Sequence, residues 1–284
     1  MKLDAATFLL QWAVGGLLFG WVTTRHRIVS LGYGWLIRIV FVTFAAGAAA
    51  VFLTGDLSAA RVVAALCAIG CVAASVVALV VSVQRRGAGV RGREEVRAAR
   101  RARVSAMIGR ADAGDQDRGA EFPPGLDLVA PVVGAAGLLV AAQFAGGPYV
   151  LAAARLLVGA VFLGAVSDAM LLGHWYLVQQ GLPREPVKEL VAWTAIAWPF
   201  ELAVFLWPTG MVQVLNGVID DGYHGVLGWI WAACALMTIG LVGLTWAALR
   251  ERYYSAVMAA TGLLYLAILT AFGTDLVARA VLRP

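Results

Sequence analysis

The sequence carries little charge for its length. Only 14% of its 284 residues are Asp, Glu, Lys or Arg, whereas 61% are hydrophobic and the mean hydropathy is +0.82. A soluble globular domain has about 25% charged residues. The deficit excludes a water-soluble enzyme and indicates a chain that lies mostly in a lipid bilayer.

Lysine and cysteine are also scarce. The two lysines are Lys2 and Lys188, and ten arginines lie between positions 85 and 118, so the net charge of +5 is largely local. A basic block beside apolar segments is typical of a topology signal rather than of nucleic-acid binding. The three cysteines lie inside apolar runs, so we expect neither a disulfide framework nor a metal site.

Apolar runs long enough to cross a bilayer recur along the chain. They lie at about 5–24, 33–54, 59–83, 126–144, 149–173, 187–208, 224–249 and 256–278. We treat the first as a retained helix rather than a cleaved signal peptide. The pattern predicts an all-α, polytopic membrane protein with about eight transmembrane helices: three in residues 1–83, a loop at 84–125, and five in residues 126–284.

The distribution of Lys and Arg predicts the orientation of the bundle. If the Arg-rich loop is cytoplasmic, that side collects sixteen basic residues and the other side four. We therefore expect a multi-pass protein of a bacterial inner membrane, surrounded by membrane lipids, with both termini outside.

The loop itself leaves three interpretations open. Residues 93–108 combine good helix formers with Glu-to-Arg spacings near i,i+4, so they predict a surface helix. That helix either lies on anionic headgroups, or belongs to a solvated loop, or docks a cytoplasmic partner. The Gly-rich segment 87–92 matches a dinucleotide-binding fingerprint by letter only, because no buried strand precedes it.

Ionisable residues within the apolar runs are the main functional candidates, since each costs about 2.5–3.5 kcal/mol at the bilayer centre on insertion scales. They are Arg38, Arg155, Asp168 and Glu201. The helical rise places Arg155 and Glu201 near one depth and allows Arg38 to meet Asp168 nearer the loop. Such pairs are either structural ion pairs or proton-handling groups. Pro199 predicts a kink beside Glu201.

A turn is expected after the fifth run, at Gly173-His174-Trp175-Tyr176-Leu177. Trp175 and Tyr176 fit an aromatic belt at the membrane surface. Alternatively, His174 or Tyr176 hydrogen-bonds a quinone carbonyl, Trp175 supplies an aromatic wall and Asp168 exchanges the proton. We predict no haem, because the three histidines do not form a facing pair.

The last helix resembles a known family. Residues 255–266, together with the ending Gly273-Thr274-Asp275-Leu276-Val277-Ala278-Arg279, resemble the closing helix of quinol-site membrane-anchor subunits of bacterial respiratory oxidoreductases of the dimethyl-sulfoxide-reductase type. An acidic residue and an arginine also finish the helix there. The resemblance implies a role for Asp275 and Arg279, whose spacing also fits an intrahelical pair.

These features together favour an accessory membrane subunit of an electron-transfer complex. It would contribute a quinone or quinol pocket and a proton path without its own redox centre, and other protein subunits would carry the electrons. One alternative is a transporter or channel for a small solute or lipid. The other is a structural subunit that binds no ligand.

Overall fold

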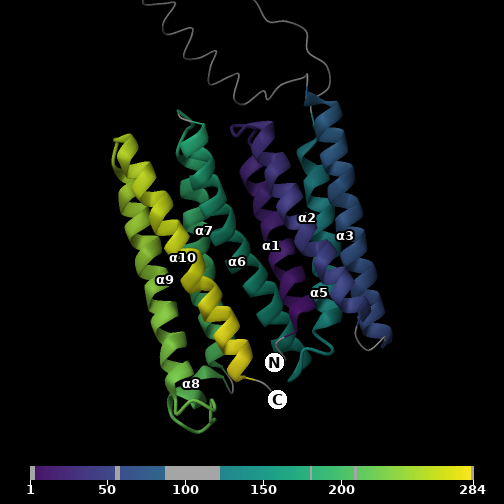
Figure 1. Cartoon of the computed structure of the whole chain (residues 1–284), viewed down its shortest axis with the longest axis vertical. Helices are drawn as coiled ribbons and strands as arrows, with labels where there is room; N and C mark the ends of the chain where they lie inside the picture. The colour runs from purple at the N-terminus through teal and green to yellow at the C-terminus, as the bar shows by residue number, and fades with distance from the viewer. Residues whose placement is uncertain (1–3, 55–57, 87–121, 180, 208–209, 283–284) are drawn as a thin grey trace, which may run out of the picture.

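The computed structural model describes residues 4–54, 58–86, 122–179, 181–207 and 210–282, and the secondary structure in these ranges is helical. Eight of the described segments are long and apolar enough to cross a membrane, as the sequence predicted. With the labels of Figure 1, the elements are α1 (Ala5–Thr24), α2 (Leu31–Thr54), α3 (Ala59–Gln84), η2 (Pro124–Leu128), α5 (Val129–Ala141), α6 (Tyr149–Val178), α7 (Glu185–Leu206), α8 (Met211–Leu215), α9 (Val226–Arg250) and α10 (Tyr254–Val281).

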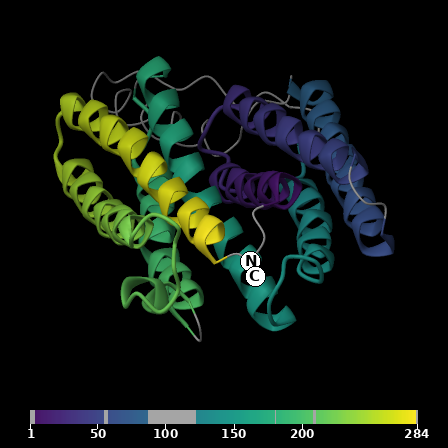
Figure 2. The ribbon, with the colours of Figure 1, turned by 60° about the horizontal axis from the view of Figure 1, so that its bottom comes forward.

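Helices α1 and α6 form the centre of the bundle. Two thirds of each span is buried, against 28–39% for the other six. Figure 1 shows α2, α3 and α5 on one side of this central pair and α7, α9 and α10 on the other, and Figure 2 gives the same arrangement from below. Polar residues on α1 and α6 therefore face protein rather than lipid.

Glycines bring the two central helices into backbone contact. A Cβ atom added at Gly15 would lie 1.9 Å from the carbonyl oxygen of Ala160, and one added at Gly164 would lie 2.2 Å from the backbone of Gly15. Small residues at membrane helix interfaces permit such close approach, where van der Waals packing drives association. The contact lets short polar side chains on α1 reach across to the helices around α6.

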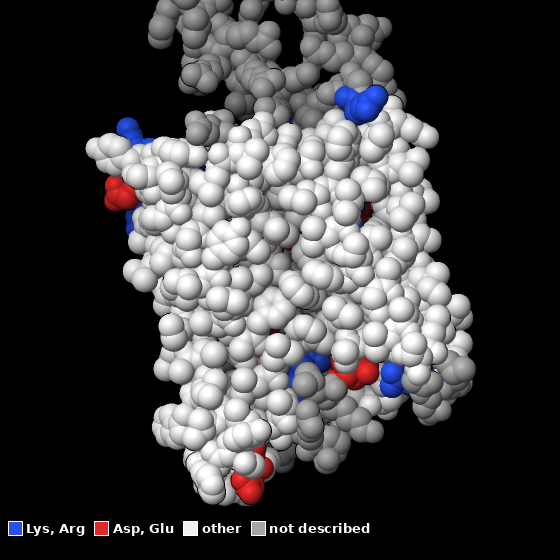
Figure 3. Space-filling model, in the orientation of Figure 1, with Lys and Arg blue, Asp and Glu red and all other residues white. Residues whose placement is uncertain are grey.

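The outer surface of the bundle is an apolar belt. Large side chains on the peripheral helices are well exposed, among them Leu66 of α3, Leu236 of α9 and Leu269 of α10, at 59%, 67% and 69%. On the face in Figure 3, the visible charged side chains lie mainly near the two ends of the molecule. This surface suits hydrocarbon rather than water.

Both termini lie at one end of the bundle, as an even number of spans requires (Figure 1). We call this the terminal end. The opposite end, where α3 finishes and η2 begins, we call the loop end. The surface helix expected at 93–108 lies outside the described residues, so that prediction stays untested.

Two predicted boundaries were wrong. Helix α6 continues to Val178, so the segment 173–177 is helical and not a turn. No proline occurs between Pro148 and Pro183, and the hydrogen-bonded turns therefore continue through Gly173. At the fourth span, the short 3₁₀ helix η2 precedes α5 and brings Asp127 into the bundle.

The connection before α9 is organised by one carboxylate. Asp221 accepts hydrogen bonds from the backbone N–H groups of Tyr223, Gly225 and Leu227, each at 2.8 Å, and Gly225 has φ +83°. Partial desolvation alone raises the pKa of Asp221, but these N–H groups together with that of Gly228 outweigh it and lower the pKa below its ordinary 3.8. The acidic turn is thus the cap of α9.

Candidate functional site

A group of five polar side chains is buried between α1, α6, α7 and α10 in the half nearer the terminal end. We call it the terminal cluster, and its members are Gln11, Arg155, Glu201, Asp275 and Arg279. Arg155 is 5% exposed and the other four are 0% exposed. The sequence indicated all of these as candidate functional residues except Gln11, whose side chain is uncharged and gave no signal.

Hydrogen bonds tie three members of the terminal cluster together. Arg279 Nε donates to Asp275 Oδ2 at 2.7 Å, which confirms the i,i+4 pair. Arg279 also donates through Nη2 to Gln11 Oε1, and Gln11 Nε2 donates to Asp275 Oδ1 at 3.5 Å. The pair that the sequence placed at the end of the last helix is therefore part of the core and joins α10 to α1.

Glu201 faces a second carboxyl group. It interacts electrostatically with Asp275, Arg279 and Arg155. Neither carboxyl oxygen of Glu201 has a hydrogen-bond partner among the described residues. Two carboxylates only accept hydrogen bonds, so a bond between these two acids requires a proton on one of them. We call Glu201 and Asp275 the acid pair.

The net charge of the terminal cluster depends on whether one of the two acids holds a proton. With the proton present, two guanidinium groups face one carboxylate, and without it they face two, so the cluster carries +1 or 0. Nη2 of Arg155 and Nη1 of Arg279 are buried without a partner and provide unused donors for a second carboxylate. Either protonation state is therefore compatible with burial.

Arg155 and Glu201 meet at one level, as the helical rise predicted, but no direct hydrogen bond joins them. Instead Arg155 Nε donates to the Val204 carbonyl at 2.8 Å, and its guanidinium lies 5.5 Å from the Phe205 ring centroid. Arg155 thus anchors α6 to α7 and adds positive charge beside the acid pair.

A further buried acid, Asp168 of α6, stands apart from cations. It is 0% exposed and neither carboxyl oxygen has a hydrogen-bond partner. Tyr33 Oη donates to its backbone carbonyl at 3.3 Å, and a Cβ added at Gly20 would lie 3.8 Å from Oδ2. An ionised carboxylate here would have neither a donor nor a counter-ion.

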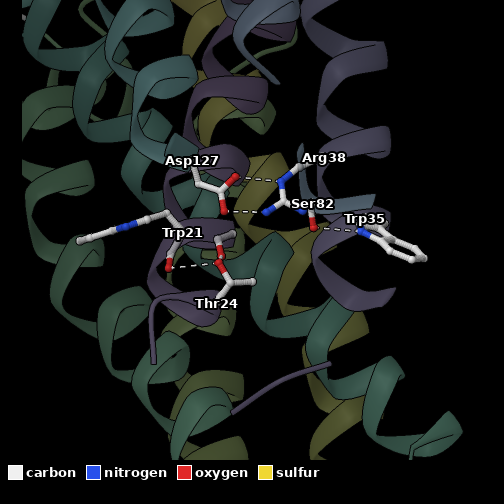
Figure 4. Close-up of polar contacts among 7 residues, drawn as sticks. Trp21, Thr24, Trp35, Arg38, Ser82 and Asp127 are labelled. Atoms are coloured by element: carbon white, nitrogen blue, oxygen red, sulfur yellow. Dashed lines mark hydrogen bonds and ion pairs between the residues drawn. The ribbon is translucent and has the colours of Figure 1, made fainter. Parts of the chain in front are cut away.

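The expected pairing of Arg38 with Asp168 was wrong. Arg38 binds Asp127 of η2 through two parallel bonds, Nε to Oδ1 at 2.8 Å and Nη2 to Oδ2 at 2.7 Å (Figure 4). The guanidinium also lies 4.7 Å from the Phe122 ring centroid. Asp127 escaped notice because it stands at the very start of the fourth apolar run, where an acidic residue is typical of the membrane surface.

A narrow cleft adjoins the Arg38–Asp127 pair, and it has room for about one water molecule. Arg38 Nη1 and Ser75 Oγ line it without a hydrogen-bond partner, and Gly20 also borders it. Gly20 and Ile37 both border this cleft, and a Cβ added at Gly20 would lie near Ile37 as well as near Asp168.

His174, Trp175 and Tyr176 point to three different neighbours. His174 Nδ1 lies 3.1 Å from Tyr265 Oη on α10. The indole of Trp175 donates to Ser30 Oγ at 3.1 Å and to Gln179 Oε1 at 3.0 Å. Tyr176 is buried and donates to the Pro183 carbonyl at 2.6 Å. The structure does not bring the three side chains onto one wall.

Tyr176 lines a second cleft at the loop end, with about 410 Å³ of empty volume. Arg184, Arg252 and Tyr254 also border it. The guanidinium of Arg184 is already bonded to backbone carbonyls between α9 and α10, with Nη2 donating to Tyr253 O at 3.0 Å. This cleft therefore offers few unused donors from Arg184.

Comparison with protein-family models, curated proteins and solved structures finds no match. The resemblance of the last helix to respiratory membrane anchors therefore stays an expectation. What the function rests on is the placement of the buried acids.

Proposed function

We propose that the protein is a multi-pass subunit of an electron-transfer complex in a bacterial inner membrane, and that it moves protons for quinone chemistry. In this proposal the Arg-rich loop and the loop end face the cytoplasm, and both termini face outside. Other subunits carry the electrons, and a quinone or quinol is the redox partner within the lipid. The excess of basic residues on the loop side supports the orientation.

The observation that carries the proposal is the burial of the acid pair, Glu201 and Asp275, beside two arginines. A buried ion pair kept for stability alone is often no better than apolar residues of similar volume. Here two acids interact with each other, and Arg155 and Arg279 each have one buried guanidinium nitrogen without a hydrogen-bond partner. That arrangement suits a group that binds and releases a proton.

Asp168 supplies a second buried acid nearer the loop end. It lies thirteen residues from Arg155 on α6, about 20 Å along the helix axis. At the level of Asp168, Trp12 Nε1 donates to the neighbouring Ser167 Oγ at 2.9 Å, across α1 and α6. The same helix pair thus carries polar groups at successive depths, which supports proton transfer along the centre of the bundle.

The test uses the complex purified from native membranes in mild detergent. Glu201→Gln keeps the shape of the side chain but removes its acid. We expect quinol-dependent turnover to fall about 10²-fold, the lower bound for loss of a general acid or base, with the subunit retained at normal abundance. Glu189→Gln is the matched control, because Glu189 lies on the same helix and pairs with Arg25 near the loop end. It should keep near-normal turnover.

Two results contradict the proposal. Unchanged turnover in Glu201→Gln assigns the terminal cluster to structure, which is the third interpretation of the sequence. Purification of the subunit as a lone homomer, without any redox partner, removes the electron-transfer complex altogether.

A second candidate, a small-solute transporter, is favoured by the cleft that the Arg38–Asp127 pair and Gly20 border. The spans do not support it further: α7 continues through Pro199 to Leu206 as one helix, whereas many transporters have broken helices at mid-membrane. Solute flux in liposomes containing this protein alone would favour transport.

A further inference from the structure

The pair formed by His174 and Tyr265 lies on the outer surface of the bundle. His174 Nδ1 and Tyr265 Oη are 3.1 Å apart, and their rings meet edge to face with centroids 6.2 Å apart. His174 is exposed and Tyr265 is 43% exposed. We call these two residues the surface dyad.

The surroundings of the surface dyad face lipid. On α10, Met258 and Leu269 flank Tyr265 on the same side at 53% and 69% exposure, and open space adjoins Gly262. On α6, Val178 follows His174 by one turn and is 70% exposed. The dyad is thus a polar spot in an apolar face, open to a molecule that arrives through the bilayer.

Tyr265 is set apart from the other tyrosines of α10. It is eleven residues from the start of α10, about 16 Å along the helix axis. Tyr253 and Tyr254 lie at the loop end of that helix, at 74% and 40% exposure, where aromatic residues anchor a helix at the membrane surface. The hydroxyl group of Tyr265 is instead paired with His174, which lies one turn before the end of α6.

Gly173 sets the spacing of the surface dyad. A Cβ added there would lie 3.1 Å from Thr261 Oγ1 and 3.4 Å from Leu264 Cδ1, both on α10. A larger residue would push α10 away from α6. The glycine next to His174 therefore keeps the imidazole within hydrogen-bonding distance of the phenol.

The surface dyad offers one donor and one acceptor outward in either tautomer. When Tyr265 donates to Nδ1, the histidine presents Nε2–H and the phenol oxygen accepts. When Nδ1–H donates, the phenol O–H is free and Nε2 accepts. The ligand that matches is a ring bearing a carbonyl or hydroxyl group, attached to an apolar body soluble in the bilayer.

We propose that the surface dyad of His174 and Tyr265 is the docking site for a quinone-type headgroup that enters laterally from the lipid. This inference rests on the proposed function and names its ligand site, and it adds Tyr265, which the sequence did not single out. His174 or Tyr265 donates to the ring carbonyl, while the tail remains in lipid beside Met258 and Leu269. Trp175 and Tyr176 do not contact the headgroup.

The experiment measures equilibrium binding of 2,3-dimethyl-1,4-naphthoquinone to the full chain in lipid nanodiscs, against empty nanodiscs. Tyr265→Phe removes the hydroxyl and keeps the ring, so we expect affinity to fall about five- to tenfold, as for loss of one hydrogen bond. His174→Phe should cause a similar loss. With carbonyl-labelled naphthoquinone, the infrared carbonyl stretch should shift to lower frequency on binding, and each variant should reduce the shift.

Tyr254→Phe is the matched control, because Tyr254 lies on the same helix, has similar exposure and borders the cleft at the loop end. It should bind like the wild type. Loss of binding in Tyr254→Phe or Tyr176→Phe, with Tyr265→Phe unaffected, overturns the proposal and moves the site to that cleft. Absence of saturable binding to the wild type overturns it too. Intact binding together with unchanged turnover of Glu201→Gln refutes the proton function while leaving the headgroup site standing.

Discussion

The contact between Gly15 and Gly164 holds the polar groups of the bundle in place, so a single methyl group there has a large predicted effect. In Gly15→Ala the new Cβ would lie 1.9 Å from the carbonyl oxygen of Ala160 and 2.8 Å from its carbonyl carbon. Both atoms are backbone, so no side chain can rotate away. Helices α1 and α6 must separate by about 1 Å to restore even a 3.0 Å contact.

Overpacking of a close-packed interior costs typically about 1–3 kcal/mol, and a backbone obstacle places this substitution at the upper end. A loss of about 3 kcal/mol lowers the folding equilibrium constant about a hundredfold. Separation of the helices also withdraws Gln11, one turn before Gly15, from Asp275 and Arg279. The substitution should therefore lower the stability and break the hydrogen bonds of the terminal cluster at the same time.

The assay is unfolding of the protein in bicelles by added denaturing detergent, followed by circular dichroism. Gly243→Ala is the control, because Gly243 lies within α9 with nothing within 4 Å of its added Cβ. There the helix propensity of alanine should leave stability unchanged or raise it by up to about 1 kcal/mol. Equal unfolding curves for the two variants would refute the close contact between α1 and α6.

The remaining predictions concern the two ends of the bundle. Asp127→Asn should destabilise the protein by about 3–5 kcal/mol in the same unfolding assay, because it leaves Arg38 buried without its counter-ion. The double variant Arg38→Leu with Asp127→Leu should be less damaging than the single change, and additive losses would show that the two residues are not coupled. At the terminal end, the stabilising contacts of the Asp221 carboxylate are complete above pH 3.8 and are lost as the pH falls through its lower folded-state pKa, because protonation removes the charge that the backbone N–H groups favour. The amide NMR shifts of Gly225 and Leu227 should titrate together with a midpoint below pH 3.8, and a midpoint above that value would contradict the cap.

The number and nature of the helices followed from hydropathy, because each span must satisfy its own backbone in lipid and so needs about 20 apolar residues. The depths of Arg155 and Glu201 followed equally well from the helical rise. The hydrogen-bond and ion-pair partners of the buried residues did not follow from the sequence. Depth alone allowed Arg38 to meet Asp168. Asp127, which follows the double proline Pro123-Pro124, instead enters the bundle through η2 and pairs with Arg38.

The segment 173–177 illustrates a different failure. Its aromatic residues looked like one wall of a pocket because they are consecutive, but consecutive residues on a helix point about 100° apart. Once α6 runs through Val178, His174, Trp175 and Tyr176 must face three neighbours. The partner of His174 is ninety-one residues away in sequence, on α10.

Composition and periodicity alone determined that this chain is helical, where the eight segments long and apolar enough to span a membrane lie, and that Arg155, Asp168 and Glu201 lie well inside them. They do so because the bilayer acts on each segment separately, through length and transfer free energy. Only the tertiary structure decided which of those residues meet. Glu201 shares its surroundings with Asp275, Arg38 pairs with Asp127, and Asp168 has no cation, because packing of α1 against α6 through glycine sets the distances between side chains on different helices.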